Sequence, residues 1–202
     1  MIRIIIIFSL ITVSLAAKGQ EYTSAYHIGW NTFVPFSDKD FIGSTSTAGI
    51  RLGYSKFVGD RFGFGFEAGY STLDDYIPPT TYEHPGGAIT TDVYNYLYYF
   101  TLMANGQYYF SPGKRFMPYT SLGMGVAFSE YTIFYNVYQE NDHNTGFVIR
   151  PEIGTLFKLK ENSNFGLKAA MGFEYATNGS DYFETTNLSG FNFQLGIVLL
   201  NR

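Results

Sequence analysis

The stretch over residues 47–72 reads Thr-Ala-Gly-Ile-Arg-Leu-Gly-Tyr-Ser-Lys-Phe-Val-Gly-Asp-Arg-Phe-Gly-Phe-Gly-Phe-Glu-Ala-Gly-Tyr-Ser-Thr. On each side of its centre, large apolar side chains alternate with glycine, serine or charged residues. Because successive side chains of a strand point to opposite faces, each arm predicts a β-strand with one apolar face. The short connection around Gly59 and Asp60 predicts a hairpin. A bulky aromatic face opposite a glycine-rich face is typical of a strand between lipid and a narrow wet lumen.

The composition limits the class of protein. The chain has 202 residues with 18 Tyr, 20 Phe and 22 Gly, and its formal net charge is -4. This length without a composition shift predicts one domain, and the absence of a basic run argues against nucleic acid as a partner. Because the chain has no cysteine, disulfides, thiol nucleophiles and thiolate metal sites are excluded.

The first residues have the pattern of a secretory signal peptide. Arg3 supplies a positive charge, and residues 4–13 form an apolar run that is too short for a membrane-spanning helix. Cleavage after Ala16 and cleavage after Gly19 both fit the pattern. The sequence therefore predicts a signal peptide over residues 1–19 and a barrel domain over residues 20–202, in which any membrane span is made of strands.

The same alternation recurs along the chain and predicts eight strands. They cover residues 22–33, 47–57, 62–72, 93–110, 117–129, 147–159, 165–175 and 188–200. Tight turns alternate with four long polar loops at residues 35–44, 74–92, 131–145 and 177–186. An even strand number with alternating long and short connections is typical of outer-membrane barrels, whose long loops are external. We therefore expect an all-β, eight-stranded antiparallel up-and-down transmembrane β-barrel in the cell outer membrane, with both termini in the periplasm.

Two other architectures share this alternation: a soluble barrel of the lipocalin kind and a periplasmic sandwich. In a soluble barrel the apolar face lines the interior. Here the apolar face is crowded with Phe, Tyr, Leu and Ile, which an eight-stranded interior could not hold, and the opposite face is rich in Gly, Ser and Ala. We therefore expect the bulky face to lie outside.

Several segments of the chain have motifs that are typical of strands and turns in small barrels. They are Leu52-Gly53-Tyr54, Phe66-Glu67-Ala68-Gly69-Tyr70, Gln107-Tyr108-Tyr109-Phe110, Met117-Pro118-Tyr119, Gly123-Met124-Gly125 and the closing strand over residues 190–199. Together they resemble the outer-membrane β-barrel domain family common in Bacteroidetes, which includes porin-like and PorT-like small barrels. The resemblance covers nearly the whole mature chain and implies the fold and compartment, with outer-membrane lipid or lipopolysaccharide and the barrel-assembly machinery as partners. The motifs imply no particular activity.

Histidine and serine are the candidates for chemistry. Some small outer-membrane barrels are lipid A acyltransferases or deacylases that use a histidine with serine or acidic partners, so Ser129 or Ser24 near a histidine would be the pattern of such an enzyme. His84 and His143 lie in predicted loops, and His27 lies alone among small residues. Residues 140–144 offer oxygen ligands but lack the spacing of a calcium loop. We expect no catalytic, cofactor-binding or metal-binding residues.

Hairpin register predicts ion pairs in the lumen. With residues 58–60 as a three-residue loop, Arg51 lies opposite Glu67, and with residues 161–163 as a loop, Arg150 lies opposite Glu174. All four side chains belong to the small-residue face. Directly opposed residues are close enough for an arginine to bond a carboxylate. We expect these pairs to plug the lumen, and a gate in a small pore is the alternative.

The sequence favours a non-enzymatic barrel that presents four external loops for surface interaction or envelope integrity. Binding residues concentrate in loops held by a rigid scaffold, and aromatic side chains supply much of the contact energy. The candidate external-loop contacts are Tyr76, Tyr82, Tyr131, Phe134, Tyr135 and Tyr138. The alternatives are a lipid-modifying outer-membrane barrel enzyme and a narrow pore.

Overall fold

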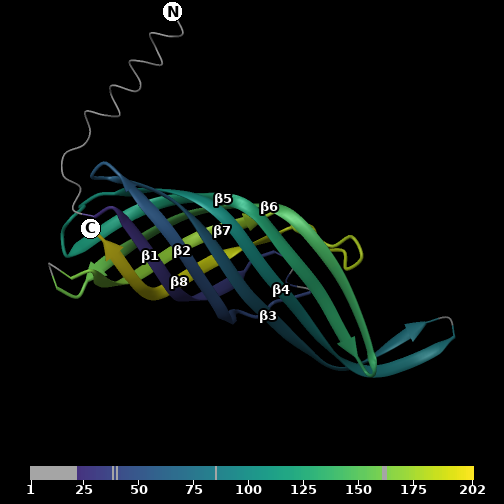
Figure 1. Ribbon diagram of the computed structural model, residues 1–202. Coiled ribbons are helices and arrows are strands. Elements are labelled where there is room, and N and C mark those ends of the chain that lie inside the picture. Colours follow the sequence, from purple (N-terminus) through teal and green to yellow (C-terminus); the bar gives the residue numbers. More distant parts are fainter. Residues whose placement is uncertain (1–21, 38, 40, 85, 161–162) are drawn as a thin grey trace, which may run out of the picture.

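The computed structural model describes residues 22–37, 39, 41–84, 86–160 and 163–202, with His84 described in its backbone alone. Eight antiparallel strands close into one ring in chain order (Figure 1). The strands are β1 (Ser24–Pro35), β2 (Ser46–Val58), β3 (Phe62–His84), β4 (Gly87–Tyr109), β5 (Phe116–Tyr135), β6 (Tyr138–Lys158), β7 (Phe165–Ala176) and β8 (Leu188–Asn201). The predicted eight-stranded barrel is confirmed, whereas the predicted signal peptide lies outside the described residues. None of the described residues forms a helix long and apolar enough to cross a membrane.

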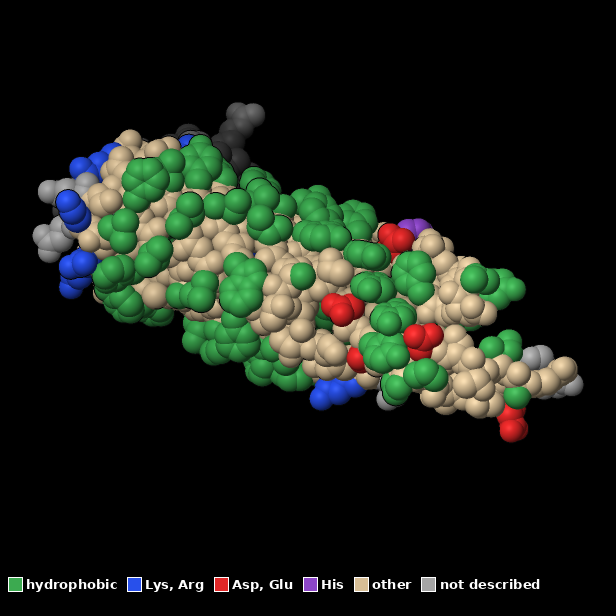
Figure 2. Space-filling view, turned by 90° about the horizontal axis from the view of Figure 1, so that it is seen from below, with side chains coloured by type: hydrophobic (Ala, Val, Ile, Leu, Met, Phe, Trp, Pro, Cys, Tyr) green, Lys and Arg blue, Asp and Glu red, His purple; other side chains and the backbone are tan. Residues whose placement is uncertain are grey.

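The two faces of the wall follow the alternation in the sequence. On β3, Phe62, Phe64 and Phe66 are 51 to 71 % exposed, whereas Glu67 is buried. The same contrast holds on β8, where Leu195 is exposed and Gln194 is buried. Figure 2 shows hydrophobic side chains spread over the outside of the barrel wall. The bulky face is therefore outside and the small and polar face lines the lumen, as the sequence predicted.

Two glycines allow neighbouring strands to approach closely. A Cβ atom added at Gly65 would lie 1.9 Å from the carbonyl oxygen of Tyr54, and one at Gly125 would lie 1.9 Å from that of Leu102. No side chain fits at such a distance. Glycine at these positions therefore permits the tight curvature of a small barrel wall.

The two ends of the barrel differ in their connections. At the short-turn end, residues 59–61, 110–115 and 159–164 join consecutive strands. Ser24 pairs with Asn201, so the start of β1 and the end of β8 also lie at this end. At the opposite end, which we call the hairpin end, β3–β4 and β5–β6 extend well past the ring (Figure 1).

The prediction of a long loop over residues 74–92 was wrong. Residues 74–84 of β3 pair with residues 87–96 of β4, and a shift of register falls at Pro78 and Pro79. Their missing N–H groups are tolerated there because this part of β3 is an edge, beyond the last pairing with β2. Thr81 and Thr90 bond across the hairpin at 2.8 Å. Both faces of this segment lie beyond the barrel wall, so neither face needs apolar side chains. The polar sequence therefore led to the wrong prediction of a loop.

The prediction of a loop over residues 131–145 was also wrong. Residues 131–135 of β5 pair with residues 138–142 of β6, and only Asn136 and Val137 form the turn. Asn136 has a φ of 53°, the left-handed conformation that asparagine adopts more readily than most residues. A tight turn there makes a continuous hairpin possible.

The other two predicted loops remain loops, but they fold over the mouth of the barrel. In the first loop, Phe41 and Ile42 are buried, and in the last loop, Asn178 and Ser180 are buried. The hairpin end therefore carries two projecting hairpins and two inward-folded loops, in place of the four long loops that the sequence predicted.

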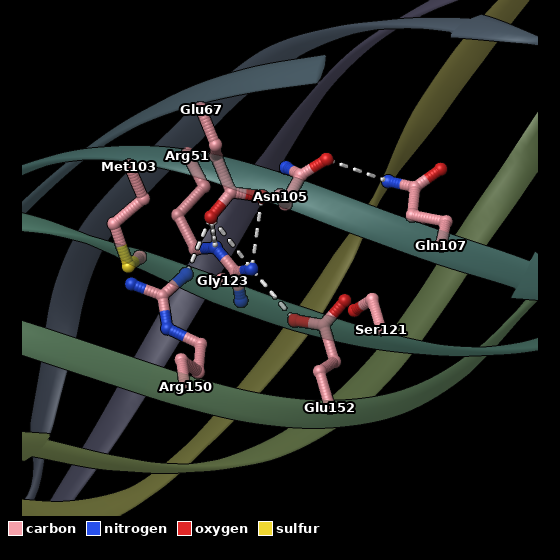
Figure 3. A pocket seen from close by; sticks show the side chains of 9 residues that line it. All are labelled: Arg51, Glu67, Met103, Asn105, Gln107, Ser121, Gly123, Arg150 and Glu152. Carbon is pink, nitrogen blue, oxygen red and sulfur yellow. Dashed lines mark hydrogen bonds and ion pairs between the residues drawn. The ribbon is translucent and has the colours of Figure 1, made fainter. Parts of the chain in front are cut away.

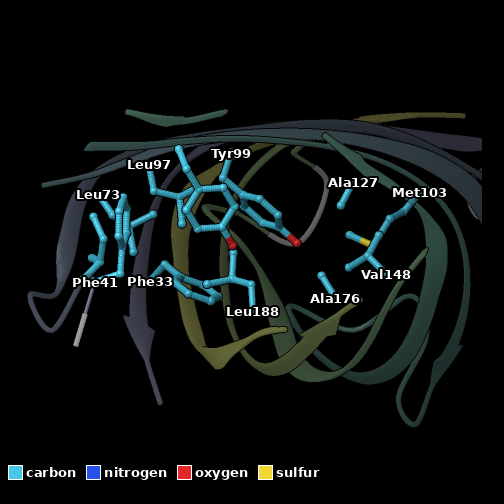
Figure 4. Close-up of a cluster of buried hydrophobic side chains, with 12 residues drawn as sticks. Phe33, Phe41, Leu73, Leu97, Tyr99, Met103, Ala127, Val148, Ala176 and Leu188 are labelled. Carbon is cyan, nitrogen blue, oxygen red and sulfur yellow. The ribbon is translucent and has the colours of Figure 1, made fainter. Parts of the chain in front are cut away.

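Apolar clusters occupy both halves of the lumen. In the half toward the hairpin end, a cluster that we call the upper cluster (Figure 4) comprises Phe33, Phe41, Ile42, Leu73, Leu97, Tyr99, Met103, Ala127, Tyr131, Val148, Ala176 and Leu188. In the half toward the short turns, the lower cluster comprises Tyr22, Ala25, Phe57, Tyr109, Met117, Tyr119, Leu156, Val198 and Leu200. Charged side chains lie between the two clusters.

Candidate functional site

Three strands aim charged side chains at the centre of the lumen (Figure 3). The Arg51 Nη2 atom of β2 donates to both carboxylate oxygens of Glu67 on β3, at 2.9 Å each. It also donates to Glu152 Oε2 of β6 at 2.6 Å, across the lumen. Arg150 of β6 contacts the same Glu67 carboxylate. All four side chains are buried, so each charge is stabilised by its opposite inside the barrel.

The cluster extends along the lumen wall through Arg150 and Glu174. Arg150 Nε donates to Glu174 Oε2 at 2.5 Å, and Asn192 Nδ2 donates to the same oxygen at 3.1 Å. Glu174 is thus satisfied by two donors from β6 and β8. Because a buried carboxylate without donors is costly, these bonds fix the position of Glu174 in the lumen.

Lys168 of β7 and His27 of β1 complete the cluster. Lys168 Nζ lies 3.8 Å from Glu67 Oε2 and 3.9 Å from Glu152 Oε1. His27 Nε2 lies 3.2 Å from Glu67 Oε2 and 3.2 Å from Lys168 Nζ. The cationic members, Arg51, Arg150 and Lys168, match the anionic members, Glu67, Glu152 and Glu174. This lumen ion cluster therefore balances its formal charge.

The register of the first predicted pair was wrong, although the pair itself forms. Arg51 lies opposite Gly69, and Glu67 lies opposite Gly53, because the turn is formed by residues 59–61. The long arginine side chain reaches the carboxylate diagonally, at a spacing that long side chains can span. The register of the second pair was predicted correctly. Ile149 pairs with Tyr175 and Glu152 pairs with Gly172, and this register sets Arg150 opposite Glu174.

The sequence reasoning missed Glu152, Lys168 and His27 as members of this cluster. Alternation alone places all three on the small-residue face, so the signal was present. Counting residue pairs back from a hairpin turn, however, relates only strands that are adjacent in the ring. The bond between Arg51 on β2 and Glu152 on β6 crosses the lumen, and the diameter of the barrel determines such a contact.

Two small cavities lie beside the ion cluster in the described part of the lumen. A cavity on one side of the ion cluster is lined by residues that include Gln107 and Ser121, and a second cavity is lined by residues that include Asn31 and Thr101. Each has a volume of about 10 Å³, which is room for about one water molecule. The upper and lower clusters occupy the lumen on either side of the ion cluster.

The serine–histidine pattern of a lipid-modifying enzyme is not assembled. Ser129 points into the lumen, where it accepts a bond from Asn178 Nδ2 at 3.1 Å, whereas His143 is exposed on the outside. His27 belongs to the ion cluster. Among the described side chains, no hydrogen bond joins a serine to a histidine.

The structure separates the predicted contact residues. Tyr76, Tyr82 and Tyr138 are exposed on the projecting hairpins, and Phe134 and Tyr135 are half-buried. Tyr131 was predicted wrongly as an external contact. It is 1 % exposed, since its ring faces the lumen.

Tyr131 instead anchors the two inward-folded loops. Its ring centroid lies 5.2 Å from that of Phe41 in the first loop and 6.5 Å from that of Phe183 in the last loop. Asn178 Nδ2 also donates to the carbonyl oxygen of Ala127 at 3.0 Å, and Gly43 N donates to Asp75 Oδ2 at 3.0 Å. Aromatic packing and hydrogen bonds therefore hold both loops over the mouth.

Charge divides between the two ends of the barrel (Figure 2). The acidic side chains described at the hairpin end are Asp74, Asp75, Glu83, Asp92, Glu130, Glu140, Asp142, Asp181 and Glu184, and Lys39 is the only lysine or arginine described there. The short-turn end carries Lys56, Arg61, Lys114, Arg115, Lys160 and Arg202. The potential at the hairpin end is therefore negative.

Comparison with known proteins gives one family match. The family model described as "outer membrane protein beta-barrel domain" matches residues 5–199. No curated protein matches this chain.

Solved structures of two proteins show the likeness in fold. Ail, the attachment invasion locus protein of Yersinia pestis, aligns over 90% of this chain and 99% of its own at 14% identity, with a TM-score of 0.55. In complex with the heparin analogue sucrose octasulfate its TM-score is 0.53. The outer membrane protease OmpT of Escherichia coli aligns over 92% of this chain and 99% of its own at 7% identity, with a TM-score of 0.51. At these identities the likeness shows the fold alone.

Proposed function

Because this chain belongs to the outer membrane protein beta-barrel domain family, we propose that it is a non-enzymatic outer-membrane barrel that presents a rigid β-sheet extension to partners outside the cell. One contrast carries the proposal. The lumen is closed by two apolar clusters and an ion cluster, whereas the hairpin end projects and exposes aromatic side chains. Exposed aromatic side chains on a rigid scaffold bind at a low cost in conformational entropy.

The closed lumen argues against the alternative of a narrow pore. An ion that crossed it would have to pass both apolar clusters and break bonds within the ion cluster. Single-channel recording on the purified protein in a planar bilayer tests this alternative, and the proposal expects no conductance steps.

A lipid-modifying enzyme is the second alternative. The fold itself allows catalysis, as the protease OmpT has a similar barrel. Ser129 and His143 lie on opposite faces of the wall, which argues against a serine–histidine mechanism at this place. We expect the purified barrel to release no fatty acid from lipid A or phospholipid.

The charge of the hairpin end defines the class of partner. Ail has been solved with a heparin analogue, which is a sulfated polyanion. The described hairpin end of this chain is acidic, so a polyanion would meet like charge there. We therefore propose neutral or cationic partners, such as an uncharged glycan or a basic protein surface.

The same proposal includes the orientation and the assembly partners. The hairpin end is external and both termini are periplasmic, since long extensions of outer-membrane barrels face outward. Outer-membrane lipid or lipopolysaccharide surrounds the apolar belt, and the barrel-assembly machinery inserts the chain. The motif resemblance favours the small barrels of Bacteroidetes as the subgroup.

The experiment compares cells that display the wild type with cells that display a triple variant, Tyr76→Ser, Tyr82→Ser and Tyr138→Ser, on a panel of immobilised neutral glycans and extracellular proteins. The matched control changes the same three tyrosines to phenylalanine, which keeps the rings. We expect wild type and control to bind a member of the panel and the serine variant to lose that binding. Undiminished binding by the serine variant, or no binding by the wild type, would contradict the proposal.

A further inference from the structure

An open crevice of about 300 Å³ lies on the outward face of the wall, where the apolar belt meets the projecting hairpins. Its lining includes two neighbouring rows of side chains. One row across the strands contains Tyr70, Phe100, Phe128 and Thr145, and the next row contains Tyr98, Glu130 and His143. The crevice therefore joins a mainly aromatic row to a row that carries a carboxylate, as a site at the boundary between lipid chains and headgroups would require.

Glu130 is the charged group at this boundary. Its side chain is 36 % exposed, and His143 Nδ1 lies 3.8 Å from its Oε2 atom. That distance is too long for a good hydrogen bond, and the His143 side chain is itself 68 % exposed. In the described part of the chain, no lysine or arginine lies within 4.0 Å of the Glu130 carboxylate. A cationic group from outside the protein would complete this site.

We propose that the crevice binds a membrane lipid whose headgroup carries a primary amine. The ammonium group bonds Glu130, and an acyl chain packs on Phe100 and Phe128. Three observations support this: the negative charge of Glu130, the aromatic side chains one row below it, and an open volume that joins them. Tyr98, which lies directly opposite Glu130 on the neighbouring strand, also lines the crevice. An anionic headgroup without an amine would instead meet the carboxylate.

The inference rests on the membrane location within the proposed function, but it does not depend on which end of the barrel is external. Failure of the proposed partner binding at Tyr76, Tyr82 and Tyr138 would leave it intact. Conversely, loss of lipid selectivity would leave the surface-display proposal intact.

Native mass spectrometry tests the site on the full barrel released from nanodiscs that contain equal amounts of phosphatidylethanolamine and phosphatidylcholine with the same acyl chains. The two lipids differ only in the amine, which in phosphatidylcholine has no N–H donor. We expect the wild type to retain phosphatidylethanolamine with about fivefold preference, the factor expected for one partly exposed charge-assisted contact.

Two variants make the result specific. Glu130→Gln should retain both lipids equally, while Glu83→Gln, which removes an exposed acid from the β3 extension, should keep the wild-type preference. Glu130 lies on the outward face of the wall and Glu83 on the extension beyond it, and circular dichroism checks that each barrel is folded. Equal retention by the wild type, or an unchanged preference in Glu130→Gln, would overturn the proposal.

A further arm separates the lipid from a free amine. Soluble ethanolamine is added at the concentration of the lipid headgroup. If the aromatic row contributes, ethanolamine should not displace the retained lipid. Displacement would show that the amine alone is recognised and would overturn the assignment of a lipid to this crevice.

Discussion

The guanidinium of Arg51 contacts two carboxylates, those of Glu67 and Glu152, at the centre of the barrel. Glu67 is shared in turn by Arg51, Arg150, His27 and Lys168. Charges in such a cluster depend on one another because removal of one member leaves its partners buried and unpaired. At the scale of single residues, this interdependence can be measured.

We predict that Arg51→Ala and Glu67→Ala will each lower the free energy of unfolding by about 3 to 5 kcal/mol. The double variant should lose less than the sum, because neither partner is then left alone. Urea unfolding in lipid vesicles measures all three, with Asp60→Ala in the exposed turn as a control that should change stability by less than about 0.5 kcal/mol. Strict additivity would show that the two side chains do not interact.

Glu140 gives a pH-dependent contact at the hairpin end. Its carboxylate accepts hydrogen bonds from Tyr182 at 2.6 Å and from Tyr135 at 2.7 Å, and these bonds hold the pKa of Glu140 below its usual value of 4.5. A lowered pKa stabilises the folded contact above pH 4.5, and this contribution is lost as the pH falls through the lowered pKa. The loop over residues 177–187 should therefore loosen at acidic pH.

Hydrogen exchange of this loop measures the effect. Glu140→Gln removes the ionisable group, so the difference in exchange between wild type and variant should be present at neutral pH and vanish at low pH. Asp142 also faces the loop, through a bond from Ser180, and it remains in both proteins. A difference that persists below the lowered pKa of Glu140 would contradict the assignment.

At the scale of elements, the hairpin end shows where the sequence was informative and where it was not. The alternation of residues 62–72 predicted the membrane part of β3, but residues 74–84 have no such alternation because lipid and lumen no longer lie on their two sides. Cross-strand pairs such as Thr81–Thr90 replace it. Apolar and polar residues do not alternate in a strand that faces water on both sides. The continuation of β3 could therefore not be predicted from its sequence.

Tyr131 is the element-scale anchor of the two inward-folded loops. We predict that Tyr131→Ala will free both loops, since loss of a buried aromatic side chain costs about 3 to 5 kcal/mol. Lys39 and Glu184 are exposed on the two loops, so their rates of cleavage by trypsin and glutamyl endopeptidase report how freely each loop moves. Both rates should rise in Tyr131→Ala while the barrel remains folded, whereas Tyr138→Ala, which removes an exposed ring, should leave them unchanged. Unchanged rates in Tyr131→Ala would show that the loops are held by other contacts.

For the whole molecule, the closed barrel could be predicted from two features of the sequence. Eight segments alternate large apolar with small or polar residues, and long connections alternate with short ones, which leaves few other arrangements of the strands. The ion cluster could be predicted only in part. Neighbouring strands gave Arg150 with Glu174 and, with an error of register, Arg51 with Glu67. The partners across the lumen, Glu152 and Lys168, depend on the closed ring, which no local pattern contains.

The apolar belt can be tested by its depth dependence. Leu195→Arg, near the middle of β8 on the outward face, should cost about 2 to 4 kcal/mol in a bilayer, whereas Val58→Arg at the short-turn end should cost about 0 to 1 kcal/mol. Both wild-type side chains are exposed, so burial in the protein does not explain the difference. Unfolding in lipid vesicles measures both variants, and equal costs would mean that Leu195 does not face lipid.

The absence of cysteine from the chain makes the orientation directly measurable. Val137 is 83 % exposed at the tip of the β5–β6 hairpin, and Asp60 lies in the turn at the opposite end. Cells that express either Val137→Cys or Asp60→Cys are treated with a membrane-impermeant maleimide, before and after the outer membrane is permeabilised. The account predicts that Val137→Cys is labelled on intact cells and that Asp60→Cys is labelled only after permeabilisation. Labelling of Asp60→Cys on intact cells, with Val137→Cys protected, would contradict it.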